Sequence, residues 1–164
     1  MVDRAWVLSR FYRVAYQLAR AYWFVARPKQ RGVKCAITRG DEVLLVRHTY
    51  GDRRSWDMPG GAIKRREAPL DAARREIREE LGLSIADWTP LGDFFARYEH
   101  RDDTMYCFHT VVDDVNPVAD RIEIAELRWF PMTALPERTG QFVRRILSMS
   151  EAAAAPRMTP TGRA

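Results

Sequence analysis

The spacing of apolar and polar positions predicts a chain of short strands interrupted by helices. Three strands come first, at residues 32–38, 42–48 and 58–63. The turn Arg39-Gly40-Asp41 joins the first two strands in a hairpin, and a polar loop leads into the third. Residues 68–81 then follow a helical period. The first half of the chain is therefore predicted as three strands followed by a helix.

The second half repeats this alternation and ends in another helix. Strands are predicted at residues 91–98, 105–112 and 124–130, and the first two form a hairpin. Residues 131–135 are predicted as a turn or a short helix, and residues 142–147 as part of a final helix. Strands flanked by helices in the order βββαβββα suggest an α/β fold built as an α/β/α sandwich.

An additional amphipathic helix is predicted at residues 4–27, ahead of the first strand. One face carries the apolar residues Val7, Phe11, Val14, Ala15, Leu18, Tyr22 and Val25, and the other carries Arg10, Arg13, Gln17, Arg20 and Arg27. We expect this helix to pack on its own domain or on a second subunit. The alternative is attachment to a membrane surface, because arginine and tryptophan flanking an apolar face suit the headgroup boundary.

These patterns divide the chain into three parts. Residues 1–29 form the accessory helix, residues 30–150 one folded domain, and residues 151–164 a tail. The tail carries an alanine run and two prolines without any periodicity, so it is predicted to be disordered.

The helix at 68–81 has two distinct faces. Its apolar positions are Leu70, Ala73, Ile77 and Leu81, which should face a core. Glu76, Glu79 and Glu80 stand together on another side, where like charges three and four residues apart repel one another. A divalent cation would convert that repulsion into affinity, and carboxylate oxygens suit Mg²⁺ or Mn²⁺.

The segment from Gly61 to Leu83 resembles the Nudix box, the signature of the Nudix hydrolases. The specified positions of that signature are filled by Gly61, Glu67, Arg75, Glu76, Ile77, Glu79, Glu80, Gly82 and Leu83, without any insertion. The preceding Trp56-Asp57-Met58-Pro59-Gly60 is similar to the family's lead-in. A merely solvated, charged helix face would not explain Gly61, Glu67 or the intact spacing.

The resemblance implies a fold, a reaction and roles for individual residues. The implied fold is a mixed sheet held between helices, and the implied reaction is metal-dependent hydrolysis of a phosphoanhydride. Glu76, Glu79, Glu80 and the Gly61 carbonyl are the implied ligands of Mg²⁺ or Mn²⁺. Arg75 is expected to orient a glutamate of the box. The structural positions are Glu67, which would brace the junction between loop and helix, and Gly82, which would end the helix.

Two further groups of candidates lie outside the box. Glu123 is the best candidate for an additional acid, so Glu76, Glu79 and Glu123 form the shortlist for the general base. Arg47 and Arg97 are candidates for phosphate binding, and Trp56 for stacking on a base. The expected substrate is a nucleoside diphosphate linked to another group, such as a nucleotide or a nucleotide sugar. A non-catalytic module that binds nucleotides or regulates another protein is the alternative.

Composition narrows the compartment and the partners. The chain has 164 residues, 46% of them hydrophobic, which suits one domain with a real core. Its net charge of +5 favours anionic partners, but the basic residues are too scattered to indicate nucleic acid, although capped or triphosphorylated RNA stays open as a substrate. Cys35 and Cys107 are predicted as buried thiols, and a cytoplasmic location is expected. The composition leaves open whether the chain forms a homodimer.

Overall fold

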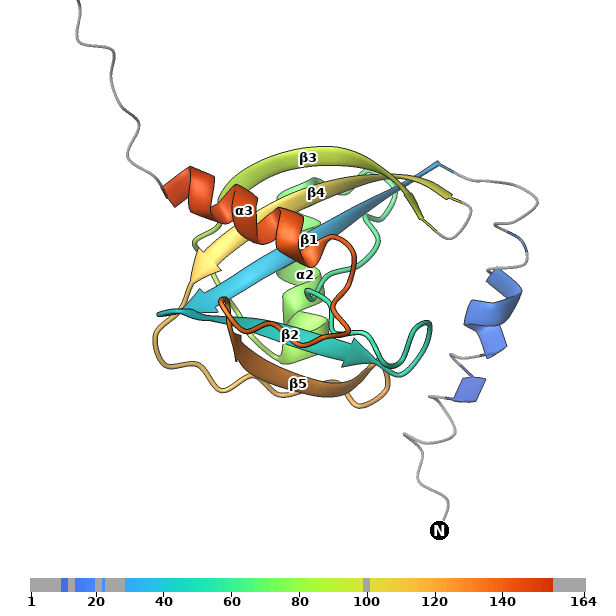
Figure 1. Cartoon of the computed structure of the whole chain (residues 1–164). Helices are drawn as coiled ribbons and strands as arrows, with labels where there is room; N and C mark the ends of the chain where they lie inside the picture. The colour runs from blue at the N-terminus through green and yellow to red at the C-terminus, as the bar shows by residue number, and fades with distance from the viewer. Residues whose placement is uncertain (1–9, 12–13, 20–21, 23–28, 99–100, 155–164) are drawn as a thin grey trace, which may run out of the picture.

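The computed structural model describes residues 10–11, 14–19, 22, 29–98 and 101–154 (Figure 1). For residues 97, 98 and 101 only the backbone is described. Its named elements are β1 (Lys29–Arg39), β2 (Glu42–His48), α2 (Pro69–Leu81), β3 (Thr89–Tyr98), β4 (Arg101–Val111), β5 (Ile124–Pro131) and α3 (Val143–Ala154).

The strands form one five-stranded sheet in the order β3-β4-β1-β2-β5. β1 runs parallel to β4, with Cys35 opposite Phe108, whereas the β1–β2, β2–β5 and β3–β4 pairs are antiparallel. The sheet is therefore mixed. The predicted hairpins at residues 32–48 and 91–112 are both confirmed.

The two helices cover opposite faces of this sheet, because alternate residues of each strand point to opposite sides (Figure 1). On one face, Val33, Cys35 and Ile37 of β1 pack with Ala73, Ile77 and Leu81 of α2. On the other face, Ala36, Val43 and Leu45 pack with Val143, Ile146 and Leu147 of α3. The α/β/α sandwich is confirmed, and both cysteines are buried free thiols.

The predicted strand at residues 58–63 is not a strand of the sheet. Residues 57–62 instead form a wedge between β1 and β2, held by isolated bridges from Asp57 to Val46 and from Ala62 to Gly32. Gly60 has a φ of 135°, a conformation incompatible with a regular strand. β1 and β2 pair only near their turn, at Thr38–Val43 and Arg39–Glu42, and the wedge fills the opening between them.

Several predicted boundaries were also wrong. β4 begins at Arg101, four residues before the predicted strand, because it continues its pairing with both β1 and β3. α3 continues to Ala154, beyond the predicted helix, so residues 151–154 of the predicted tail are helical and not disordered. The rest of that tail, residues 155–164, lies outside the described residues.

The described part of the N-terminal segment is helical and lies beside the domain (Figure 1). Four residues of its predicted apolar face are exposed, Phe11 by 67%, Val14 by 60%, Leu18 by 68% and Tyr22 by 63%, whereas Val7 and Val25 lie outside the described residues. At these four positions the expected packing of the apolar face on its own domain is not observed. Within the described residues, no helix is both long and apolar enough to cross a bilayer.

Candidate active site

The ends of α2 are set by residues that suit them, and this places the acidic residues next to the wedge. Pro69 occupies the first turn, where its missing N–H costs nothing. At the other end, Gly82 adopts a left-handed conformation with a φ of 65°, and its N–H bonds the carbonyl of Arg78. Between these ends, Ala72, Glu76 and Glu80 form one row along the helix, four residues apart.

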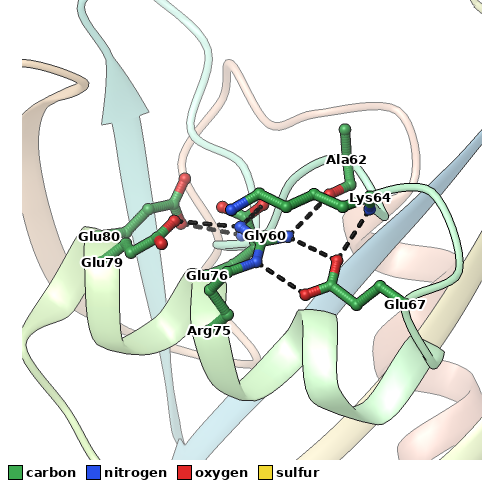
Figure 2. A network of polar contacts seen from close by, with 8 residues as sticks. All are labelled: Gly60, Ala62, Lys64, Glu67, Arg75, Glu76, Glu79 and Glu80. Atoms are coloured by element: carbon green, nitrogen blue, oxygen red, sulfur yellow. Dashed lines mark hydrogen bonds and ion pairs between the residues drawn. The ribbon is translucent and has the colours of Figure 1, made fainter.

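Glu80 is an acidic residue in an almost fully buried position, exposed by only 3%. Its Oε2 accepts a 2.9 Å hydrogen bond from the backbone N–H of Gly60 in the wedge (Figure 2). Burial is the main cause that raises the pKa of Glu80 to about 8; the negative charges of Glu76 and Glu123 act in the same direction, and the Gly60 hydrogen bond and the charge of Lys34 oppose them. Ionising Glu80 at this position therefore carries an electrostatic cost, and without a cation the side chain keeps its proton at neutral pH.

The two glycines of the wedge allow this approach of loop and helix. A Cβ added to Gly60 would lie 2.3 Å from the carbonyl oxygen of Val33, and one added to Gly61 would lie 2.7 Å from the carboxylate of Glu76. Any side chain at position 61 would therefore displace Glu76. The carbonyl oxygen of Gly61 accepts a 2.9 Å hydrogen bond from the N–H of Val33 in β1.

Arg75 ties the loop to the helix through a fan of hydrogen bonds (Figure 2). Its Nε and Nη2 donate to the two carboxylate oxygens of Glu67 at 2.8 and 2.9 Å, and Nη2 also donates to the carbonyl of Ala62 at 3.0 Å. Its Nη1 donates to Glu76 Oε1 at 2.7 Å and to Glu79 Oε2 at 3.0 Å. The Arg75 hydrogen bonds lower the pKa of Glu67 to about 2. Both the brace by Glu67 and the contact from Arg75 to a box glutamate are present.

The predicted acids do not form a ready-made cluster of ligands. Glu79 has a side chain exposed by 56% and is paired with Arg75. Glu123 lies close enough to raise the pKa of both Glu76 and Glu80, and its backbone carbonyl accepts a hydrogen bond from Thr49. In the described ranges, no group of three or more His, Cys, Asp or Glu residues is arranged to hold a metal ion.

The residues predicted to bind substrate are engaged with one another. Arg47 forms an ion pair with Glu126, and its guanidinium lies 5.2 Å from the ring centroid of Trp56. Trp56 also packs edge-on against Phe130, with 4.8 Å between centroids. The side chain of Arg97 lies outside the described residues. Arg47, at the end of β2, and Trp56, directly before the wedge, are therefore next to each other.

Sequence reasoning missed Lys34 of β1, which holds the wedge through contacts with Asp57 and Met58. Lys34 Nζ forms a 2.8 Å ion pair with Asp57 Oδ2 and donates to the carbonyl of Met58 at 3.0 Å. Its positive charge also lowers the pKa of the nearby Glu80. The available signal was a lysine within the otherwise apolar run Val33-Lys34-Cys35-Ala36-Ile37. A lysine whose side chain is only 12% exposed requires a partner, and the nearby loop supplies one.

Two curated proteins resemble this chain over about two thirds of its length. The NAD-capped RNA hydrolase NudC of Pseudomonas aeruginosa is 33% identical over 107 residues, which cover 64% of this chain and 37% of that protein. The ADP-ribose pyrophosphatase of Mycobacterium tuberculosis is 32% identical over 110 residues, which cover 63% of this chain and 53% of that protein. The chain thus spans about a third to a half of the length of these two relatives.

A solved structure shares the fold. The MutT NUDIX hydrolase from Burkholderia pseudomallei aligns with a TM-score of 0.69 at 23% sequence identity, covering 74% of this chain and 97% of that one. The family model described as the NUDIX domain matches residues 28–149, a range that holds the whole sheet, α2 and most of α3. The mixed sheet, the glycine wedge and the intact acidic motif on α2 agree with that match: the chain belongs to the NUDIX domain family.

Proposed function

We propose that this protein is a Mg²⁺- or Mn²⁺-dependent pyrophosphohydrolase, which cleaves a phosphoanhydride bond in a nucleoside diphosphate linked to another group. The observation that carries the proposal is the position of Glu80, a carboxylate exposed by only 3% beside Glu76 and Glu123. Burying negative charge in this way costs free energy unless a cation offsets it. Without a cation, folded Glu80 keeps its proton below about pH 8, whereas a bound cation would favour the charged carboxylate and offset the cost of burying it.

The residues present fit a divalent cation. Carboxylate and carbonyl oxygens are the ligands that Mg²⁺ and Mn²⁺ prefer, and Glu76, Glu79, Glu80 and the Gly61 carbonyl would supply them. Gly61 has no side chain to separate its backbone from the Glu76 carboxylate. When bound, the ion would neutralise phosphate charge and lower the pKa of a coordinated water.

The remaining roles follow from the contacts of each side chain. Arg75 holds Glu76 in place through the 2.7 Å hydrogen bond and is itself held by Glu67. Glu79 is the most exposed acid of the motif and must leave Arg75 if it is to take part. Glu76, Glu79 and Glu123 remain the candidates to accept the proton of the attacking water.

The proposed substrate class rests on a chemical group common to the two substrates named in the relatives' descriptions. NAD and ADP-ribose each contain adenosine diphosphate joined to a second group, and both names are those of proteins about a third identical to this chain. Trp56 beside Arg47 offers an aromatic surface and a cation near the wedge, which would suit a base and a phosphate. Arg47 would then have to exchange its Glu126 partner for the substrate.

A screen of substrates tests this proposal. ADP-ribose, NAD, a nucleotide sugar, a nucleoside triphosphate and a triphosphorylated RNA would each be incubated with the full chain in Mg²⁺, Mn²⁺ or EDTA. We expect metal-dependent release of a nucleoside monophosphate from at least one diphosphate-linked compound, identified by anion-exchange chromatography. Absence of turnover for all of them, in protein whose circular dichroism shows a folded state, would contradict the proposal.

One observation favours a second candidate, a non-catalytic nucleotide-binding module. Arg75 neutralises Glu76 and Glu79 directly, and no metal-holding group of three is arranged within the described ranges. Isothermal titration with ADP-ribose separates the two candidates: binding in EDTA without turnover in Mg²⁺ would support the module, and turnover would support the enzyme.

A further inference from the structure

The described residues of the N-terminal helix expose an apolar stripe. Phe11, Val14, Leu18 and Tyr22 follow the spacing i, i+3, i+7, i+11, and all four are at least 60% exposed. At about 100° per residue they lie within roughly 80° of one another around the helix axis. Large apolar side chains grouped in this way on a surface mark a site of contact with something else.

The stripe faces away from the side of the helix that contacts the domain. Tyr16 makes that contact, with its ring centroid 5.2 Å from that of Tyr50, which in turn lies 5.1 Å from His48 at the end of β2. The Tyr16 hydroxyl also lies 3.2 Å from the position of a Cβ built on Gly51. Tyr16 stands about 160° around the axis from Leu18, so the helix can hold the domain and present its apolar stripe outward.

The charge of the segment indicates what covers the stripe. Residues 4–28 contain five arginines, at positions 4, 10, 13, 20 and 27, and no acidic residue. Of the 27 lysines and arginines in the chain, 22 therefore lie elsewhere, against 22 aspartates and glutamates in total, so the net charge of +5 is the charge of this segment. A second copy would bring an equal positive charge against it, whereas an anionic surface is complementary.

We infer that the stripe formed by Phe11, Val14, Leu18 and Tyr22 docks the protein on an anionic lipid surface, with the helix lying in the plane of that surface. An apolar face in the acyl boundary and arginines at the headgroups are the features that such helices use. The sequence also places Trp6 and Trp23 in the segment, and tryptophan favours the membrane interface. The NUDIX domain would then act on substrates delivered near that surface.

Co-sedimentation of the full chain with large unilamellar vesicles tests this inference. Vesicles of pure phosphatidylcholine are compared with vesicles in which part of the lipid is phosphatidylglycerol, at low and at high salt. Leu18→Glu is the test variant, and Gln17→Glu is the matched control. Both introduce one negative charge at neighbouring, exposed positions, but Gln17 lies off the stripe. Neither position touches the proposed catalytic residues.

We expect the wild-type chain to bind the phosphatidylglycerol vesicles, and to bind them less tightly at high salt. Leu18→Glu should weaken that binding at least about tenfold, because burying a leucine contributes at least one factor of ten to an equilibrium constant. Gln17→Glu should weaken it much less. No binding by the wild type, or equal losses in the two variants, would overturn the inference.

Light scattering of the same proteins tests the alternative that a second copy of the chain, and not a membrane, covers the stripe. A wild-type dimer at micromolar concentration that Leu18→Glu converts to a monomer, with Gln17→Glu unchanged, would assign the stripe to a second copy and overturn the membrane inference. A wild-type monomer, or a dimer insensitive to Leu18→Glu, supports it. Because neither measurement requires turnover, the result is independent of the proposed hydrolysis.

Discussion

The backbone N–H of Gly60 donates a 2.9 Å hydrogen bond to the carboxylate of Glu80, which is twenty residues further along the chain. This contact joins the glycine wedge to α2 at the point where the wedge separates β1 from β2. It also places a carboxylate where water is excluded, so that its pKa rises to about 8. The local backbone and the proposed chemistry therefore depend on the same pair of residues.

Replacing Glu80 by glutamine should abolish most turnover and leave the fold intact. Glutamine retains an oxygen that can accept the Gly60 hydrogen bond, but it removes the charge proposed to hold the metal. We expect kcat to fall by roughly two orders of magnitude or more, the scale of losing one electrostatic group from a catalytic site. Turnover at saturating Mg²⁺ checks this, with circular dichroism as the control for folding. Near-normal activity of the folded variant would count against the site.

Mg²⁺ or Mn²⁺ should raise the melting temperature of the wild-type chain. A ligand that binds only the folded state stabilises it, by about 2.7 kcal/mol at a concentration a hundredfold above Kd. For a domain of this size that corresponds to roughly 5 to 10 °C. Thermal unfolding in EDTA is compared with unfolding in metal, and Glu80→Gln should show a much smaller rise. Identical curves for the wild type would mean that the acidic residues form no metal site.

Without metal, the protein should lose stability as the pH rises from about 4.5 to about 8. Folded Glu80 has a pKa of about 8 and keeps its proton in this window, whereas unfolded Glu80, with its ordinary value near 4.5, does not. Because the folded state binds more protons, the free energy of unfolding decreases with rising pH. Urea unfolding in EDTA at pH 5, 6.5 and 8 measures this decrease. Glu80→Gln should lack the contribution of Glu80 to this pH dependence. If the free energy of unfolding falls equally with pH in both proteins, the prediction is contradicted.

The features that sequence reasoning identified are those encoded locally. Helix α2 was predicted within a residue, because its apolar period, Pro69 and Gly82 all act within a few residues. The hairpin of β1 and β2 was also predicted, since Gly40 supplies the positive φ that its tight turn requires. Helix spacing alone also grouped Glu76, Glu79 and Glu80 on one side of α2.

The features that were missed depend on contacts between distant segments. The periodicity of residues 58–63 resembles a strand, but Gly60 and Gly61 direct the chain towards Glu80 and Glu76 instead of into the sheet. Helix spacing groups Glu76, Glu79 and Glu80 together, whereas the wedge buries Glu80 and leaves Glu79 in solvent. The sequence could not show which of these three acids is buried and which is exposed. That difference arises because a loop distant in sequence packs on only one side of the group.

The substitution Gly60→Ala should destabilise the protein far more than Gly40→Ala. Both glycines have a positive φ, 135° and 52° respectively. A Cβ on Gly60 would also meet the carbonyl oxygen of Val33 at 2.3 Å, whereas nothing lies within 4 Å of one on Gly40. We expect a loss of at least about 3 kcal/mol for Gly60→Ala, from backbone strain and steric overlap, and about 1 kcal/mol for Gly40→Ala. Urea unfolding measures both, and equal losses would show that the wedge is free to move.

The substitution Arg75→Lys should lower activity more than stability. One guanidinium donates at the same time to Glu67, Glu76 and Glu79, and an ammonium on a flexible stem cannot reproduce that fan. With Glu76 no longer held, we expect kcat to fall by roughly tenfold to a hundredfold, while KM changes little. Steady-state kinetics measure this split. Arg78→Lys is the matched control, because Arg78 lies on the same helix and is exposed. If the two variants have the same kcat, Arg75 only stabilises the loop and does not position the acid.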